Sequence, residues 1–305
     1  MRGRWCVLAA AILWSSGGAI SKGLELDPLS IAFYRGLFAG LALVPFVPRG
    51  RIAPRPALVP LGAAFGVMVG CFLGAVKITT SANAILLQCT SALWVVPLSL
   101  FILHEAPDIR ARASIAMAMV GIIAIVGWGY DGRPREWQGI ALGLASGVLS
   151  AVISIALRRL RGLDPIWLSA ALNLMGTVTL GVWAWASGQG LATPSGPQWV
   201  VLVLFGIFQM AIPYALYARG LRDLAAPEAT LIGLVEPVLN PIWVILFVHE
   251  WPAGPTMFGG LFLLAGLVYR YWPVGTARDS ESPEPSMSLD RAAERASNHQ
   301  AMKTP

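Results

Sequence analysis

Two ionisable residues lie deep inside apolar stretches of this sequence, where charged side chains are rare and usually functional. Glu236 is about ten residues into an apolar run, which at about 1.5 Å per residue puts it near the middle of a membrane. A carboxylate there could bind and release a proton, or hold the ammonium group of a substrate. It could equally be a protonated, hydrogen-bonded side chain that stabilises a kink at Pro237.

Arg35 is the matching cation, about six residues into a different apolar run. Its guanidinium stays charged and can bind a carboxylate through two parallel hydrogen bonds. The side chain could therefore hold an anionic group of a substrate in a cavity. It could also pair with an acidic residue of the protein, or extend outward until its charge reaches water.

Uncharged polar and aromatic residues also fall well inside apolar runs. Amides at that depth can line a cavity, or join helices through hydrogen bonds of about 1 kcal/mol or less. Tryptophan usually collects at membrane interfaces, so a mid-span tryptophan indicates either a ligand pocket or bulky core packing. With Glu236 and Arg35, the predicted substrate-binding or coupling residues are Trp14, Gln88, Trp94, Gln209, Tyr214, Asn240 and Trp243.

Long apolar helices must position these residues. Apolar residues make up 56% of the 305 residues and charged residues 12%, which is too little charge to cover a soluble protein of this length. A helix needs about 20 apolar residues to cross a membrane, and lipid excludes unpaired backbone groups. Ten runs meet that requirement, at about 5–22, 29–47, 57–76, 82–103, 113–130, 137–157, 165–187, 198–218, 227–248 and 254–272.

The chain contains two copies of one segment, at 62–105 and 203–250. Each copy opens with an apolar run that holds Phe-Gly, breaks at a short polar patch, and ends its second run in His-Glu. An Asp-Pro pair that starts an apolar helix also occurs twice, at Asp27 and Asp164. Copies about 140 residues apart are typical of membrane carriers built from internal repeats.

The distribution of Lys and Arg predicts the orientation. With the N-terminus on side one, the loops on that side hold twelve basic residues and the opposite loops hold four. The positive-inside rule then makes side one the cytoplasm and puts both termini there. The copies run in opposite directions, with five helices each: 1–130 is the first repeat, 131–273 the second, and 274–305 a polar, disordered cytoplasmic tail.

Several charged residues lie at the ends of the runs. Lys22 and Lys77 are predicted to lie at the membrane interface. Glu105 and Glu250 each follow a histidine at the end of a run, where a negative charge opposes the helix dipole. Either a position at the membrane surface or a hydrogen bond across the repeats would offset that repulsion, and the sequence leaves both open.

One further set of residues and motifs is typical of a known family: Trp14-Ser15, Lys22, Pro28 and Arg35, the segment 81–105, the runs 225–229 and 234–238, and His249-Glu250. In these features the sequence resembles the drug/metabolite transporter superfamily, specifically an EamA-type permease with two EamA repeats. The resemblance covers roughly residues 5–272 and implies an all-α membrane protein with ten helices in a 5+5 inverted repeat around a central cavity. Many members export amino acids or other small metabolites. One departure is Ser91-Ala92 in the first copy, where the second has Glu236-Pro237.

These features predict a secondary transporter of the bacterial inner membrane that exports a small metabolite, such as an amino acid, in exchange for protons by alternating access. An importer or exchanger of the same fold is the first alternative. A polytopic enzyme acting on lipid is the second, but no clustered catalytic set is visible, so we expect no enzymatic activity. A sensor or scaffold that binds ligand without transport is the third.

The expected partners are a small-molecule substrate, membrane lipid and protons as the coupling ion. The net charge of +6 is scattered over short loops, which indicates membrane orientation rather than nucleic-acid binding. Three histidines and three cysteines are too widely spread for a metal site, and no phosphate-binding loop is present, so no metal or cofactor is expected. A homodimer is compatible with the sequence, which does not determine the oligomeric state.

Overall fold

A computed structural model describes residues 2–91, 93–95, 98, 109–128, 134–160, 162–220, 223–224 and 226–272. Within these ranges every regular element is helical, as the composition predicts. Glu105 and the predicted tail at 274–305 lie outside the described residues.

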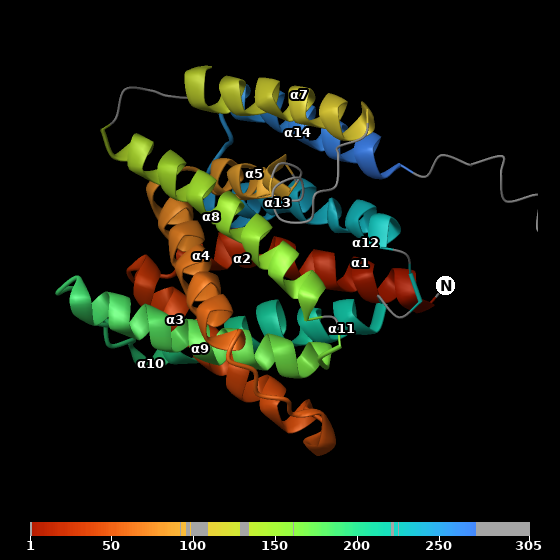
Figure 1. The fold of residues 1–305 in the computed structure, drawn as a ribbon. Helices are drawn as coiled ribbons and strands as arrows, with labels where there is room; N and C mark the ends of the chain where they lie inside the picture. The colour runs from red at the N-terminus through yellow and green to blue at the C-terminus, as the bar shows by residue number, and fades with distance from the viewer. Residues whose placement is uncertain are drawn as a thin grey trace, which may run out of the picture. The chain divides into compact units, whose positions relative to one another are not determined.

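Five helical segments make up the first copy of the repeat (Figure 1). The first segment is broken at Ser16, and the fourth is interrupted at Thr90. The fifth ends in a π-helical stretch, Ala124–Trp128. The α-helices are α1 (Arg2–Ser15), α2 (Gly17–Gly23), α3 (Pro28–Leu43), α4 (Leu58–Ile78), α5 (Ser81–Cys89) and α7 (Ile109–Ile123).

Five further segments make up the second copy. Its third segment is a helix with a π-helical centre, Phe205–Ala211, and its fourth is broken at Leu234. The α-helices are α8 (Pro134–Arg159), α9 (Pro165–Ala186), α10 (Gly196–Leu204), α11 (Ile212–Gly220), α12 (Ala226–Gly233), α13 (Val235–Val248) and α14 (Gly254–Tyr271).

Seven of the ten predicted runs form helical segments long and apolar enough to cross a membrane. The other three contain α5, α7 and α14, and they are helical where the structure describes them, apart from their ends and the turn at Thr90. The repeated Asp-Pro pair starts α3 and α9, as predicted. In each helix the proline occupies the first turn, where no backbone donor is needed. The preceding carboxylates of Asp27 and Asp164 accept hydrogen bonds from free backbone N–H groups.

The helices of the two copies pack reciprocally (Figure 1). The third segment of each copy packs on the first segment of the other, so α4 contacts α8 and α11 contacts α1. The fourth segments do the same, with α5 on α8 and α13 on α1. Equivalent helices also meet as α3 with α9, α5 with α13 and α7 with α14. Two copies related by a pseudo-two-fold axis produce this pairing, and five crossings per copy make their directions opposite.

The close contact between α4 and α9 depends on glycine. A Cβ atom built on Gly66 would lie 2.6 Å from the carbonyl oxygen of Gly176, so the helix backbones touch. We expect Gly66→Ala to destabilise the protein by about 1–3 kcal/mol, because a backbone must move to admit the methyl group. Gly127→Ala is the matched control, since no atom lies within 4 Å of its Cβ position. Thermal unfolding of both variants in detergent should lower the Tm only for Gly66→Ala; equal Tm values would contradict this packing.

Candidate functional site

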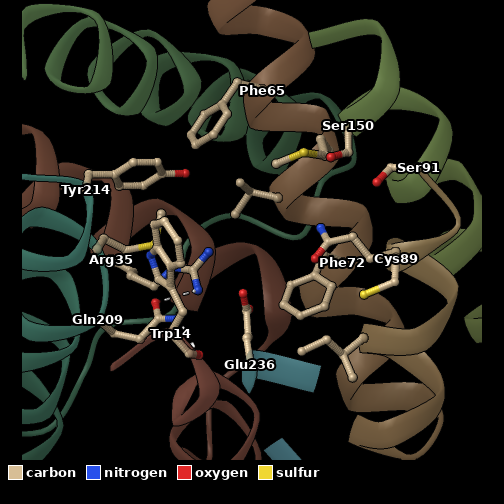
Figure 2. Close-up of a pocket in the computed structure, with 15 residues that line it drawn as sticks. Trp14, Arg35, Phe65, Phe72, Cys89, Ser91, Ser150, Gln209, Tyr214 and Glu236 are labelled. Atoms are coloured by element: carbon tan, nitrogen blue, oxygen red, sulfur yellow. Dashed lines mark hydrogen bonds between the residues drawn. The ribbon is translucent and has the colours of Figure 1, made fainter. Parts of the chain in front are cut away.

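A cavity of about 290 Å³ lies between helices of both copies (Figure 2). Its wall combines one basic and one acidic residue with amides, hydroxyls, a thiol and large apolar side chains. Six of the nine predicted site residues lie on this wall. The lining residues are Trp14, Arg35, Phe65, Met68, Val69, Phe72, Ile85, Gln88, Cys89, Ser91, Ser150, Gln209, Met210, Tyr214 and Glu236.

Arg35 is buried on α3, with 4% of its surface exposed, and its guanidinium points into the cavity (Figure 2). Its Nη1 donates a hydrogen bond to Oε1 of Gln209 at 3.3 Å. The guanidinium carbon also lies 5.1 Å from the centre of the Phe205 ring, a cation–π contact. Its buried Nε has no hydrogen-bond partner, and no acidic side chain among the described residues forms an ion pair with it. The cation therefore keeps donors available for an anionic ligand.

Gln209 holds Arg35 against the break in the first helix. It lies in the π-helical stretch of the second copy, and such stretches often occur at functional sites. Its Nε2 donates to the carbonyl oxygen of Trp14 at 3.1 Å. Asn240 makes the matching bond, from Nδ2 to the carbonyl oxygen of Ser15 at 3.0 Å. A helix that stops inside the membrane leaves carbonyl groups without partners, and these two amides satisfy them.

Glu236 lies in the first turn of α13, directly after the break at Leu234, and its carboxylate points into the cavity (Figure 2). Within the described part of the chain, that carboxylate makes neither a hydrogen bond nor an ion pair. The break gives α13 its own N-terminus in mid-membrane, where the helix dipole favours a negative charge. The carboxylate thus lies beside a helix N-terminus and keeps its oxygens available for a proton or a ligand.

The first copy has an equivalent break. Its α5 ends at Cys89, the next residue Thr90 is a turn, and Ser91 lines the cavity. No proline stands at Ser91-Ala92, where the second copy has Glu236-Pro237. Instead the hydroxyl of Thr90 donates to the carbonyl oxygen of Leu87 at 2.6 Å, so a side chain satisfies the last turn of the helix.

The remaining predicted residues differ in position. Trp14 and Tyr214 pack against each other on the cavity wall, with ring centres 5.3 Å apart. Asn240 and Trp243 do not line the cavity. Asn240 is buried beside Ser15, and Nε1 of Trp243 donates to Oγ of Ser15 at 2.8 Å. Trp94 also lies off the wall and is 37% exposed.

Sequence reasoning did not select several residues that line the cavity. Phe65 belongs to the repeated Phe-Gly pair, and Ser91 is the repeat counterpart of Glu236, so the internal repeat carried a signal for both. Phe72, Cys89 and Ser150 have no such signal, because small polar and apolar residues are common throughout the chain.

Known proteins share this architecture. The model of the EamA-like transporter family matches residues 1–127 and 137–271. Two transporters of Archaeoglobus fulgidus, both described as uncharacterized, are 22% and 27% identical over 87% and 84% of this chain and 95% and 92% of their own. The inner membrane transporter YicL of Salmonella typhimurium, also described as uncharacterized, is 22% identical over 88% of this chain and 94% of its own.

A solved crystal structure has the same fold, with a TM-score of 0.64 at 18% identity, over 88% of this chain and 96% of the other. Family model, curated relatives and fold agree with the resemblance inferred from the sequence. The chain belongs to the EamA-like transporter family and is a membrane transporter built from two copies of the family's repeat.

Proposed function

We propose that this transporter exports a small metabolite with a carboxylate group, such as an amino acid, across a bacterial inner membrane in exchange for protons. The observation that carries the proposal is that an uncompensated guanidinium, Arg35, and an uncompensated carboxylate, Glu236, share one cavity between the two copies. Charges in lipid are unfavourable, so a cavity that keeps one of each sign without an internal partner fits a ligand with complementary charges.

Size and lining support a small amphipathic substrate. A volume of about 290 Å³ is at the lower end of the range of about 300–1,000 Å³ typical of ligand pockets. Arg35 would bind a substrate carboxylate, and the amides of Gln88 and Gln209 would bind further polar groups. Trp14 and Tyr214 would pack on an apolar or cationic portion of the substrate.

Proton exchange would follow from competition at Glu236. A protonated Glu236 cannot hold a substrate ammonium group, whereas an ionised one can. A proton taken up on the outer side would release the substrate there, and its loss on the inner side would restore the site. Coupling then requires only that the proton and the substrate bind the Glu236 carboxylate in turn. Rocking of one repeat against the other would expose the cavity to each side.

The proposal includes an orientation with both chain ends in the cytoplasm, which is supported by the excess of basic residues in the loops on that side. The Salmonella relative is an inner membrane transporter, which supports the same membrane for this chain.

A comparison of metabolites tests the export of a carboxylate compound. Medium from cells that express the protein should be enriched in one or a few small carboxylates, relative to medium from cells without it. Medium from cells that express Glu236→Gln should show no such enrichment. Glu25→Gln is the matched control, because Glu25 is exposed in a loop between α2 and α3. Enrichment with both variants would argue against coupling at Glu236. Depletion of a carboxylate from the medium would instead indicate an importer. Identical media from cells with and without the protein would overturn the proposal.

A further inference from the structure

A cluster of charged side chains joins the two copies at one end of the helix bundle, away from the cavity. Nζ of Lys22, at the end of α2, lies 2.7 Å from Oε2 of Glu250, which follows α13. The same Nζ donates to the carbonyl oxygen of Thr79 at 2.6 Å. Lys77 donates to the carbonyl oxygen of Leu24, which ties α4 to the loop after α2. The side chains of Lys22 and Glu250 are only 15% and 22% exposed, so solvent screens this pair weakly.

Glu250 uses its second oxygen for another contact with the first copy. Its Oε1 accepts a hydrogen bond of 2.8 Å from the backbone N–H of Ser81, the first residue of α5. That N–H has no partner inside its own helix, so the carboxylate satisfies it. The preceding residue, His249, turns the chain with a φ of 58°, a left-handed conformation uncommon outside glycine. The cross-repeat hydrogen bond, rather than the membrane surface alone, therefore offsets the helix dipole at Glu250.

A second polar layer lies between this cluster and the cavity. Oγ of Ser81 donates to Oδ1 of Asn240 at 3.0 Å, and Asn240 and Trp243 both bond to Ser15. A Cβ atom on Gly18 would lie 2.0 Å from Oγ of Ser81, so no space remains between α2 and α5. On α13, Glu236 lies in the cavity and Asn240 in this layer, and Glu250 follows the end of the helix. Two layers thus close this end of the cavity.

The opposite end is not closed in this way. A second cavity of about 350 Å³ shares the wall residues Phe65, Met68, Ser150 and Tyr214 with the first. It extends towards Leu157 and Pro165, at the loop between α8 and α9. The two cavities are therefore neighbours across a shared wall, and the second lies towards the end that the basic loops assign to the cytoplasm.

We propose that the Lys22–Glu250 ion pair, together with the Ser81–Asn240 layer, is the latch that closes the outer end of the cavity and must open for release to the outside. The inference rests on the proposed alternating-access transport, for which it identifies the outer gate. Glu250 is suited to this role because one carboxylate from the second copy holds both α2 and α5 of the first. Removing its charge should shift the population towards an outward-open state.

Cys89 is a native reporter, because its side chain lines the cavity. In a background with Cys6→Ser and Cys71→Ala, a charged, membrane-impermeant methanethiosulfonate is added to the outer side of intact cells. We expect slow labelling of Cys89 in this background and labelling at least about tenfold faster in Glu250→Gln, since removing one partner of a poorly solvated pair weakens the closed state. Exchanging the charges, with Lys22→Glu and Glu250→Lys together, should slow the labelling again only in part, because it restores the ion pair but a lysine at 250 cannot accept the hydrogen bond from the Ser81 N–H.

Arg51→Gln is the matched control, because Arg51 also pairs across the copies, with Asp164 at 3.5 Å, but at the other end of the bundle. It should leave outer labelling unchanged. Ser91→Cys gives a second reporter on the same wall. Fast labelling of Cys89 from the outer side in the Cys6→Ser, Cys71→Ala background would overturn the latch. An unchanged labelling rate at both reporters after Glu250→Gln would also overturn it. The assay measures access without any substrate, so a failure of the proposed transport activity would not be mistaken for a failure of the gate.

Discussion

Replacing Glu236 with glutamine is expected to abolish proton-driven transport while leaving the protein folded. Glutamine keeps the size of the side chain, and the carboxylate makes no hydrogen bond or ion pair with another described residue that the change would break. The variant should therefore purify with an unchanged Tm. In inside-out vesicles that are acid inside, we expect accumulation of the substrate identified by the metabolite comparison to fall to the level of empty vesicles.

The exchange reaction separates coupling from binding. Because the proposed competition requires the Glu236 carboxylate to hold the substrate ammonium group, Glu236→Gln should also exchange labelled for unlabelled substrate more slowly without a gradient. Exchange at the wild-type rate with loss of gradient-driven transport would indicate that Glu236 acts in coupling without binding the substrate. Glu25→Gln should retain both reactions, because Glu25 lies in an exposed loop. Gradient-driven transport at the wild-type rate by Glu236→Gln would refute the coupling role.

Hydropathy predicts where the helices of this protein lie, but not where they break. A run of about 20 apolar residues must be helical in lipid, which is why all ten predicted runs are helical where the structure describes them, apart from their ends and the breaks at Ser16, Thr90 and Leu234. The interruptions at Ser16 and Leu234 change the hydropathy very little. The break at Ser16 is stabilised by groups from distant parts of the chain, because Gln209 and Asn240 donate to the carbonyl oxygens of Trp14 and Ser15. Such long-range partners are invisible to a local pattern.

The position of a polar residue within its apolar run predicts only in part whether the residue lines the cavity. Asn240 is four residues after Glu236 and shares its helix face, but it lies one turn closer to the end that holds Glu250, where α1, α5 and α13 meet. Trp243, three residues further on, reaches Ser15 instead of the cavity. Sequence spacing gives the position of a residue along its helix. Whether the residue then faces a cavity or packed side chains depends on the neighbouring helices. A substrate role for Asn240 and Trp243 stays a prediction.

Replacing Arg35 should change which substrates are carried rather than whether the protein folds. Hydrogen bonds to a charged group are worth about 1.5–3 kcal/mol, which corresponds to about 10–100-fold in apparent affinity. We expect Arg35→Gln to raise the KM for the carboxylate substrate by that factor and to leave the KM for its methyl ester nearly unchanged. Arg35→Lys should have an intermediate effect, because it keeps the charge but loses the two-pronged geometry.

Gln209→Glu tests the same idea without touching Arg35. Gln209 accepts a hydrogen bond from Arg35 at 3.3 Å, so a glutamate there would put a carboxylate beside the guanidinium and compete with the substrate for it. A neutral amide, by contrast, orients the guanidinium without compensating its charge. Gln209→Glu should therefore raise the KM for the carboxylate, again with little effect on the ester. Equal losses for acid and ester in both variants would mean that Arg35 and Gln209 only support the break in the first helix, and that another group selects the substrate.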